Sequence, residues 1–338
     1  MLTAESFCKG VWGFSYEQAQ KQIEKTQYRE FLIPKKGGIR KISYVLKDSS
    51  LWNLQQKLLK KFLAKQPVPI CVKGFIKGEN YHSFLAQHVG AEYFLRIDVS
   101  EFFSSITAEW VKHTFNELLQ CENKEEQVKL TELLCDIVIL NNVLPQGAST
   151  SPAVSNLVMA RLDQRITKYC QLFNVRYTRY ADDLLFSSRD FDFEAKKWFL
   201  KKIKYILGTQ KLKVNYSKLK HGQKEMVLNG YVIGETGVRL SRKRLEDIRH
   251  VVIFARDNGY LLKHRGPQAF LAGANQLQLK QRDLTKHPFR TIFQFVQYMC
   301  GYRAFLISLL DANETDTTFQ KDLRKLISKI EKQVDRLA

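Results

Sequence analysis

The sequence lacks several features that would place it in a well-defined class at once. Its cysteines form no CxxC pair, which disfavours a zinc site or a disulfide framework. No stretch approaches 18 apolar residues, and the N-terminus lacks a charged segment followed by an apolar run, so we expect a cytoplasmic protein that contacts no membrane. We expect the six cysteines to be reduced core residues: Cys8, Cys71, Cys121, Cys135, Cys170 and Cys300.

Acidic residues are scarce relative to basic ones. The chain has 54 Lys and Arg against 34 Asp and Glu, which gives a net charge of +20 and a pI near 9.6. Such an excess favours a polyanionic partner, with nucleic acid the leading candidate, whereas the alternative is a basic solvated surface without a specific partner. Hydrophobic residues make up 44% of the chain, which is enough for a sizeable core.

The N-terminal part of the chain combines helical and β patterns. Residues 15–28 suggest a helix, and residues 31–45 alternate around a Gly-Gly turn, which predicts a basic hairpin. Residues 49–65 carry leucines at helical spacing behind serines that can cap a helix. Residues 108–141 are again helical and strongly charged.

Acidic residues lie at the ends of two predicted β segments. Residues 93–99 (YFLRIDV) predict a buried strand with Asp98 near its end. Residues 175–188 (VRYTRYADDLLFSS) predict a hairpin with Asp182 and Asp183 at its tip. A buried charge on a strand needs a compensating partner, so these acids are the first candidates for a site.

The rest of the chain is mainly helical. Residues 141–154 predict a loop of small and hydroxylated residues that opens into a helix. After the acidic hairpin we expect a helix over 193–208, a basic segment over 211–224 and a second short hairpin over 226–241. Helices rich in Lys and Arg follow to the end of the chain.

Three close carboxylates repel one another unless a cation lies among them. Mg2+ prefers oxygen ligands, and a pair of such ions can activate an attacking hydroxyl and stabilise a leaving oxygen in nucleotidyl transfer. The alternative for Asp182 and Asp183 is structural, because Asp is common in turns.

Three motifs occur in a family-like order: FLRIDVSEFF, LPQGASTSP and YADD. Together they resemble the palm of reverse transcriptases. The resemblance implies that Asp98 and Asp182 bind two Mg2+ ions, with Mn2+ as an alternative, and that Asp183 completes the site. The backbone carbonyl of Val99 is a further candidate ligand. Copying an RNA template into DNA from dNTPs is the activity that the resemblance implies.

The same resemblance implies residues that contact the nucleotide. Phe103 matches the ring that excludes a 2′-hydroxyl; the alternative is that Phe102 and Phe103 are both core aromatics, although adjacent strand residues point opposite ways. The other candidates are Lys35 and Arg40 at the triphosphate, Gln146 and Gly147 at the nascent base pair, Lys218 at the pyrophosphate, and Asn229 with Gly230 as the primer grip.

We therefore expect an α+β right-hand polymerase. Its fingers would comprise residues 1–90 with an insertion over 108–150, its palm residues 91–240 and its helical thumb residues 241–338. The thumb would hold the template-primer duplex through contacts from Arg and Lys to phosphate.

The branch of the family is less defined. The sequence is similar to retron and phage-defence reverse transcriptases, but FLAQH and LNG match the retron motifs only at His88 and Gly230. This favours a stand-alone defence enzyme with a structured non-coding RNA template and an effector protein as a further partner. The alternatives are a retron enzyme that makes RNA-linked DNA, a template-independent or protein-guided nucleotidyltransferase, and a non-enzymatic RNA-binding scaffold.

Overall fold

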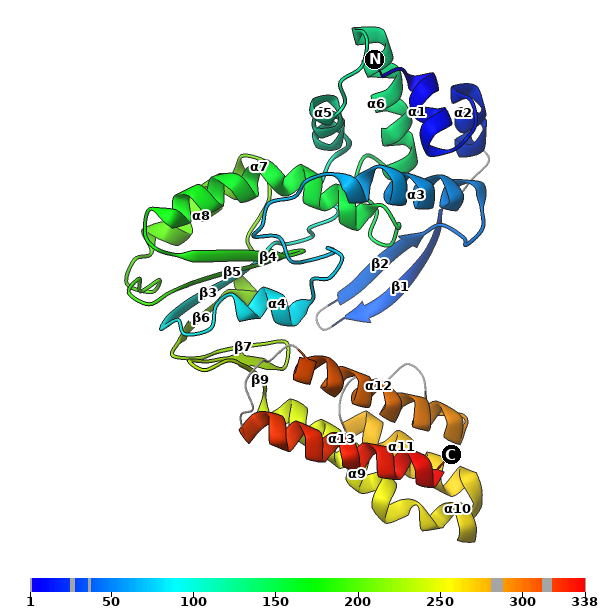
Figure 1. The fold of residues 1–338 in the computed structure, drawn as a ribbon, viewed down its shortest axis with the longest axis vertical. Coiled ribbons are helices and arrows are strands. Elements are labelled where there is room, and N and C mark those ends of the chain that lie inside the picture. Colours follow the sequence, from blue (N-terminus) through cyan, green and yellow to red (C-terminus); the bar gives the residue numbers. More distant parts are fainter. Residues whose placement is uncertain (1, 25–27, 36–37, 281–287, 312–317, 338) are drawn as a thin grey trace. The chain divides into compact units, whose positions relative to one another are not determined.

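The computed structural model divides the chain into two compact units (Figure 1). Unit 1 contains Met1–Gln87 and Tyr93–His221, and unit 2 contains His88–Glu92 and Gly222–Ala338. The division into fingers, palm and thumb stays a prediction. The structure describes residues 2–24, 28–35, 38–280, 288–311 and 318–337.

A two-stranded ribbon near the N-terminus confirms the predicted basic hairpin. Strands β1 (Arg29–Lys35) and β2 (Gly38–Tyr44) pair antiparallel along their whole length. Three large apolar side chains of this ribbon lie exposed, so it gains little from burial in unit 1. They are Phe31, Leu32 and Ile39.

Helices of unit 1 pack beside this ribbon into the larger of two hydrophobic cores. The predicted cap of the third helix is present, because the Ser49 hydroxyl accepts a hydrogen bond from the Trp52 backbone N–H at 3.3 Å. A short 3-10 turn, Leu63–Lys65, follows this helix. The helices are α1 (Ala4–Val11), α2 (Tyr16–Glu24), α3 (Ser50–Lys61), α5 (Ala108–Leu118) and α6 (Lys124–Val138).

A four-stranded sheet forms the centre of unit 1, with the strand order β4-β5-β3-β6. Strand β5 pairs antiparallel with β3 on one side and with β4 on the other. Both acidic segments therefore lie next to each other in this sheet, as the sequence predicts. The strands are β3 (Tyr93–Asp98), β4 (Arg176–Tyr180), β5 (Asp183–Ser188) and β6 (Lys220–Gln223).

Helices cover both faces of this sheet. Helices α7 (Ser151–Gln171) and α8 (Trp198–Gly208) lie along one face, and α4 (Tyr81–Ala86) lies on the other (Figure 1). Tyr177 bonds to α7, whereas Thr178 on the opposite face donates to the carbonyl of Phe84 in α4 at 3.1 Å. Alternation along the strands therefore assigns Tyr180, Asp183 and Asp98 to the α4 face.

Two predictions of local structure are wrong in detail. Helix α8 begins at Trp198 and not at residue 193, because the Asp192 carboxylate accepts the backbone N–H groups of Glu194 and Ala195 and so holds a separate turn. The cysteines are free, as predicted, but they are not all core residues: Cys121 and Cys135 are partly buried and Cys300 is exposed.

Unit 2 begins with a three-stranded antiparallel sheet, where the sequence predicts only a hairpin. Its strands are β7 (Met226–Leu228), β8 (Tyr231–Ile233) and β9 (Val238–Leu240). Asn229 and Gly230 form the two-residue turn between β7 and β8 with φ angles of 48° and 85°. Positive φ at both positions is typical of a type I′ turn, for which Asn-Gly is a favoured pair.

Helices complete unit 2 and enclose the second hydrophobic core, as the C-terminal pattern predicts. Phe270 and Phe295 are buried at its centre with ring centroids 5.1 Å apart. In the part of the chain that the structure describes, none of the helices is long and apolar enough to span a membrane. The helices are α9 (Arg242–Asn258), α10 (Tyr260–His264), α11 (Gly266–Lys280), α12 (Ile292–Asp311) and α13 (Thr318–Leu337).

Candidate active site

Strand register brings the three predicted acids together. Asp98 at the end of β3 lies directly opposite Asp183 at the start of β5. The Val99 backbone N–H donates to the carbonyl of Asp182 at 2.9 Å, which ties the neighbouring residues of both strands together. Asp98 and Asp183 are buried and Asp182 is partly buried, so these carboxylates have little water to screen their repulsion.

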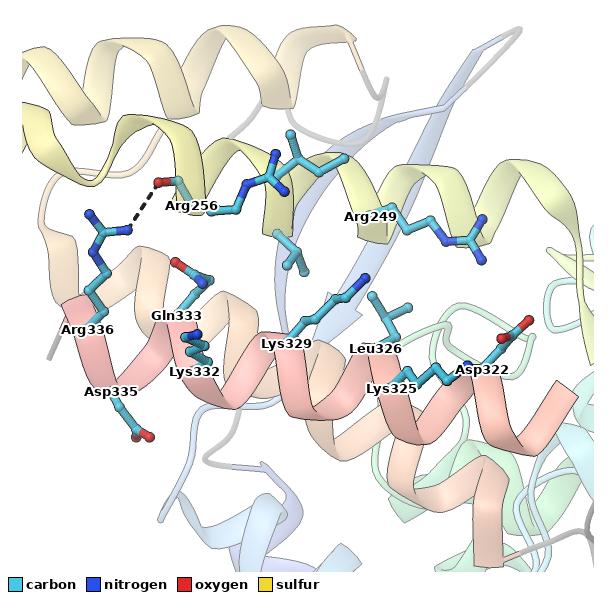
Figure 2. Close-up of a pocket in the computed structure, with 12 residues that line it drawn as sticks. Arg249, Arg256, Asp322, Lys325, Leu326, Lys329, Lys332, Gln333, Asp335 and Arg336 are labelled. Carbon is cyan, nitrogen blue, oxygen red and sulfur yellow. Dashed lines mark hydrogen bonds between the residues drawn. The ribbon is translucent and has the colours of Figure 1, made fainter. Parts of the chain in front are cut away.

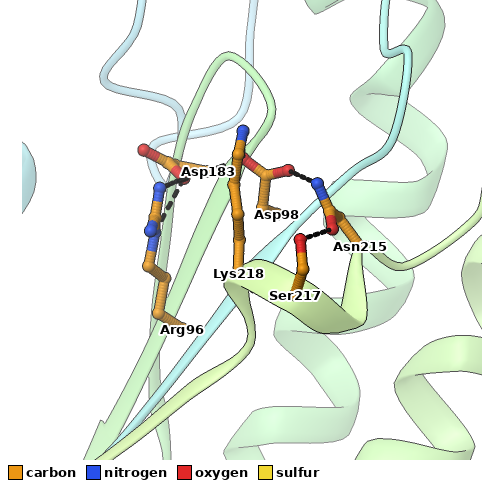
Figure 3. A network of polar contacts seen from close by, with 6 residues as sticks. All are labelled: Arg96, Asp98, Asp183, Asn215, Ser217 and Lys218. Carbon is orange, nitrogen blue, oxygen red and sulfur yellow. Dashed lines mark hydrogen bonds and ion pairs between the residues drawn. The ribbon is translucent and has the colours of Figure 1, made fainter. Parts of the chain in front are cut away.

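Arg96 lies beside the carboxylate of Asp183 (Figure 3). It is two residues before Asp98 on β3 and therefore faces the same side of the sheet. Its Nε donates to Asp183 Oδ1 at 2.9 Å, its Nη2 also contacts that oxygen, and Nη2 lies 3.9 Å from Asp98 Oδ2. The guanidinium thus neutralises part of the negative charge that the strand register concentrates.

A second set of contacts comes from the segment before β6. Lys218 Nζ lies 2.9 Å from Asp98 Oδ2, and Asn215 Nδ2 donates to Asp98 Oδ1 at 3.0 Å (Figure 3). The Asn215 backbone N–H donates to the Asp98 carbonyl at 2.8 Å, and Ser217 Oγ donates to Asn215 Oδ1 at 2.7 Å. Both carboxylate oxygens of Asp98 therefore have a hydrogen-bond donor.

The surroundings of Asp182 disfavour its charged form. Burial raises the pKa of Asp182 to about 6, and the charges of Asp183 and Asp98 contribute further. Burial also raises the pKa of Asp183, while Arg96 opposes the shift. Since the folded-state pKa of Asp182 is above its ordinary value of 3.8, the free energy of unfolding falls as the pH rises from about 3.8 to about 6 and stays at the lower level above that, and a bound cation would offset this loss.

Three carboxylates at one strand end are oxygen donors of the kind that Mg2+ prefers. Among the described residues, however, no three His, Cys, Asp or Glu side chains converge closely enough to hold a metal. Arg96 contacts the carboxylate of Asp183, and Lys218 contacts that of Asp98. The three carboxylates match such an ion in the type of donor atom.

A fully buried ion pair fixes the turn that carries Asp182. Arg179 on β4 donates from Nη2 to Asp163 Oδ2 on α7 at 2.7 Å and from Nε to Oδ1 at 2.9 Å. Its Nη1 donates to the carbonyl of Ala181 at 3.2 Å, and the Tyr177 hydroxyl donates to Asp163 Oδ1 at 2.8 Å. Ala181 has a φ of 55°, so the turn needs such support.

The glutamine-glycine loop contacts the basic hairpin. The Gln146 carbonyl accepts a hydrogen bond from the Ser43 backbone N–H at 2.8 Å. Gly147 has a φ of 126°, and a Cβ there would lie 2.7 Å from Ile42 Cγ2 and 2.8 Å from the Ser43 carbonyl oxygen. The close approach predicted for Gly147 is therefore found against β2, and contact with a nucleotide stays a prediction.

The two phenylalanines after Asp98 differ in burial. Phe102 lies in the core, whereas Phe103 is only partly buried, and their ring centroids are 5.4 Å apart. Of the two rings, only that of Phe103 is accessible enough to contact a bound nucleotide. The role of Phe103 in excluding ribonucleotides stays a prediction.

The other predicted residues lie outside this cluster of contacts. Arg40 is exposed on β2 opposite Ile33, and the side chain of Lys35 lies outside the described residues. Asn229 and Gly230 belong to unit 2, where their positive φ angles serve the β7–β8 turn. Their predicted roles at the triphosphate and the primer are not tested by these contacts.

Sequence reasoning missed Arg96 and Asn215. The contact of Arg96 with the acids could have been predicted, because Arg96 stands two residues before Asp98 in β3 and so faces the same side of the sheet. Asn215 is 117 residues from Asp98 in sequence, and no spacing rule connects them. Asp163 gave no signal either, since it lies within an ordinary helical pattern.

Unit 2 contains a basic groove between α9 and α13 (Figure 2). Its volume is about 850 Å³, and Val252, Ile253 and Leu326 contribute apolar surface. The Oε1 atom of Gln333 is buried there and has no hydrogen-bond partner among the described residues. The charged residues that line it are Arg249, Arg256, Asp322, Lys325, Lys329, Lys332, Asp335 and Arg336.

Comparison with known proteins identifies the class. Residues 33–233, more than half of the chain, match the family described as reverse transcriptase (RNA-dependent DNA polymerase). The chain therefore belongs to the reverse transcriptase family. This confirms the predicted α+β right-hand polymerase fold, to which the helices and antiparallel sheets described above conform.

Within this family the similarity is to bacterial retron enzymes. The retron Ec86 reverse transcriptase of Escherichia coli is 31% identical over 66% of this chain and 68% of the relative. The retron Mx65 reverse transcriptase of Myxococcus xanthus is 33% identical over 48% of this chain, and the match spans 41% of that relative's length. A telomerase structure from Candida albicans matches 92% of this chain. The match spans 64% of the telomerase chain, with 12% sequence identity and a TM-score of 0.48.

We predict that Asp163→Asn destabilises unit 1 strongly, because it leaves the buried Arg179 guanidinium without its counterion. Removing one partner of such a pair costs about 3–5 kcal/mol. Thermal or urea unfolding followed by circular dichroism would measure the loss. Glu132→Gln is the matched control, since its ion pair with Lys112 is exposed and contributes under about 1 kcal/mol. Equal stability of both variants would contradict a supporting role for Asp163.

Proposed function

We propose that this protein is an RNA-directed DNA polymerase that uses Asp98, Asp182 and Asp183 as its metal-binding acids. The observation that carries the proposal is the register of β3 and β5, which sets Asp98 opposite Asp183 beside Asp182 in a chain of the reverse transcriptase family. Asp98 and Asp182 hold two Mg2+ ions, or Mn2+ in their place, with Asp183 and the carbonyl of Val99 as further ligands.

When bound, the two ions would activate the primer hydroxyl and stabilise the leaving pyrophosphate oxygen. The protein supplies the remaining parts of the reaction. Lys218, now placed against Asp98, is near enough to the acids to meet the departing pyrophosphate, and Asn215 orients Asp98. Arg96 holds Asp183 on the face that Asp98 shares.

Three segments that precede the acidic hairpin in the sequence contact the nucleotide. Phe103, partly exposed beside the buried Phe102, lies beneath the sugar and excludes a 2′-hydroxyl. Gln146 and Gly147 face the nascent base pair from a loop that the hydrogen bond to Ser43 holds against β2. Lys35 and Arg40 on the β1–β2 hairpin bind the triphosphate, to which cationic side chains are suited.

The partner is an RNA template, which becomes paired to the DNA product. The α9–α13 groove of unit 2 suits an RNA backbone, because cations on both helices can contact phosphates. Asn229 and Gly230 form the primer grip at the β7–β8 turn.

The biological role that we propose is antiphage defence in the cytoplasm, with a structured non-coding RNA as template and an effector protein as a further partner. A retron enzyme that makes RNA-linked DNA is the second candidate, and the similarity to retron reverse transcriptases supports it. The paired acids support an enzyme over a binding scaffold. A template-independent transferase would share the same acids and is separated by experiment.

Replacing the acids tests the chemistry directly. We predict that Asp98→Asn and Asp182→Asn each lower incorporation of labelled dNTP on an RNA template with Mg2+ at least about a hundredfold, because groups that stabilise developing charge contribute at that order. The assay measures primer extension by purified protein.

Asp190→Asn is the matched control, since Asp190 is an exposed acid at the far end of the same hairpin. Wild-type activity in Asp98→Asn would refute catalysis at this site. Extension by the wild type with dNTPs but no template would instead favour the template-independent activity.

Neutralising the groove tests RNA binding. We predict that the combined change of Arg249, Lys325 and Lys329 to Gln lowers the slope of log affinity against log salt for a structured RNA by about 2–3, since each phosphate contact contributes about 1. Fluorescence anisotropy over a salt series measures the slope.

The control changes three exposed lysines of unit 1, Lys197, Lys201 and Lys202, to Gln. These lie on or beside α8, and none of them is a predicted nucleic-acid contact. A slope that falls equally in both triple variants would show that the groove contributes only general charge.

The template and the type of product are tested by sequencing the nucleic acid that copurifies with the protein. One discrete RNA with complementary DNA supports a dedicated template, and a mixture of cellular RNAs contradicts it. RNase treatment that increases the gel mobility of the DNA indicates a covalent RNA–DNA product. The defence role fails if plaque counts are unchanged in cells that express the protein with its neighbouring genes.

A further inference from the structure

Phe75 combines exposure with an unfavourable backbone conformation. Its φ is 63° and its side chain is 45% exposed. A bulky side chain at positive φ is uncommon, because Cβ is brought close to the backbone carbonyl. Such a conformation persists only where the surrounding structure holds it, and it is more frequent at functional sites than elsewhere.

The segment that carries Phe75 is fixed to the acidic turn. A Cβ on Gly74 would lie 2.7 Å from the Ala181 backbone nitrogen, so only glycine fits against this turn. Asn156 on α7 donates to the Gly74 carbonyl at 2.9 Å, and the Lys73 backbone N–H donates to the Arg179 carbonyl at 2.8 Å. Phe75 is therefore held in place relative to the residues around Asp182.

The ring of Phe75 contacts two aromatic residues of the candidate active site. Its centroid is 6.4 Å from that of Phe103 and 6.2 Å from that of Tyr180, which stands two residues before Asp182. Tyr180 in turn packs on Tyr81 and Phe84 of α4 at 5.2 Å and 5.8 Å. The inner rings form a supporting layer, and Phe75 is the member that presents a large aromatic surface to solvent.

We propose that Phe75 is a nucleotide-contacting residue whose exposed ring packs on a nucleobase of the nascent base pair. The proposal rests on the proposed polymerase function, because it needs a nucleotide at the acids. Phe103 occupies the place proposed for the sugar, and Phe75 extends the same aromatic surface beyond it. Every nucleobase has a planar face, so a phenylalanine binds all four without selecting a sequence.

A comparison of Phe75→Leu with Phe75→Tyr tests this contact. Leucine keeps apolar volume but has no planar face, whereas tyrosine keeps the ring. We expect Phe75→Leu to raise the KM for dNTP about tenfold on an RNA template with a DNA primer and Mg2+, since stacking on one base contributes at that order. The kcat at saturating dNTP should change much less, and Phe75→Tyr should retain a KM within about twofold of wild type.

Two controls separate contact from a structural effect. Tyr205→Ala removes another exposed ring of unit 1, on α8, and should leave the KM unchanged. Thermal unfolding of Phe75→Leu should match that of wild type, because the ring is not a core residue. An unchanged KM in Phe75→Leu, or a lowered kcat with no change in KM, would overturn the inference while the polymerase function stands. Absence of extension by wild type would overturn the proposed function itself.

Discussion

The structure of unit 1 depends on holding three carboxylates together at one end of a strand pair. Pairing of β3 with β5 sets Asp98 against Asp183, and Asp182 follows from the same turn. Like charges in a buried setting oppose this arrangement, as the raised pKa of Asp182 indicates. Arg96 offsets part of the repulsion through its ion pair with Asp183, and Lys218 does so through its ion pair with Asp98.

The surrounding elements resist that repulsion by fixing the backbone. The buried Arg179–Asp163 pair holds the Ala181 carbonyl, Gly74 packs against the same turn, and Asn215 binds Asp98 through side chain and backbone. These contacts come from α7, from the loop before α4 and from the segment before β6. The acids are therefore positioned by parts of the chain distant in sequence, which makes their geometry a property of the whole unit.

Local sequence patterns predicted the helices and strands around the site. They could not predict which residues distant in sequence contact one another. Alternation and turn residues identified the basic hairpin, the strand that ends at Asp98 and the acidic turn, since each depends on neighbours in sequence. The close approach expected at Gly147 is found against β2, because a sequence shows that glycine is needed but not what it meets, and its contact with a nucleotide stays a prediction. Asp163 and Phe75 gave no signal, since their roles arise from contacts across the fold.

We propose that Asp98, Asp182 and Asp183 together bind divalent cations. Electron paramagnetic resonance of Mn2+ in the presence of a dNTP would count the bound ions and measure their affinity. We expect Asp98→Asn to weaken Mn2+ binding at least about tenfold, because a charged oxygen ligand is lost, whereas Asp190→Asn should bind Mn2+ as wild type does. Equal Mn2+ affinity in wild type and Asp98→Asn would contradict it.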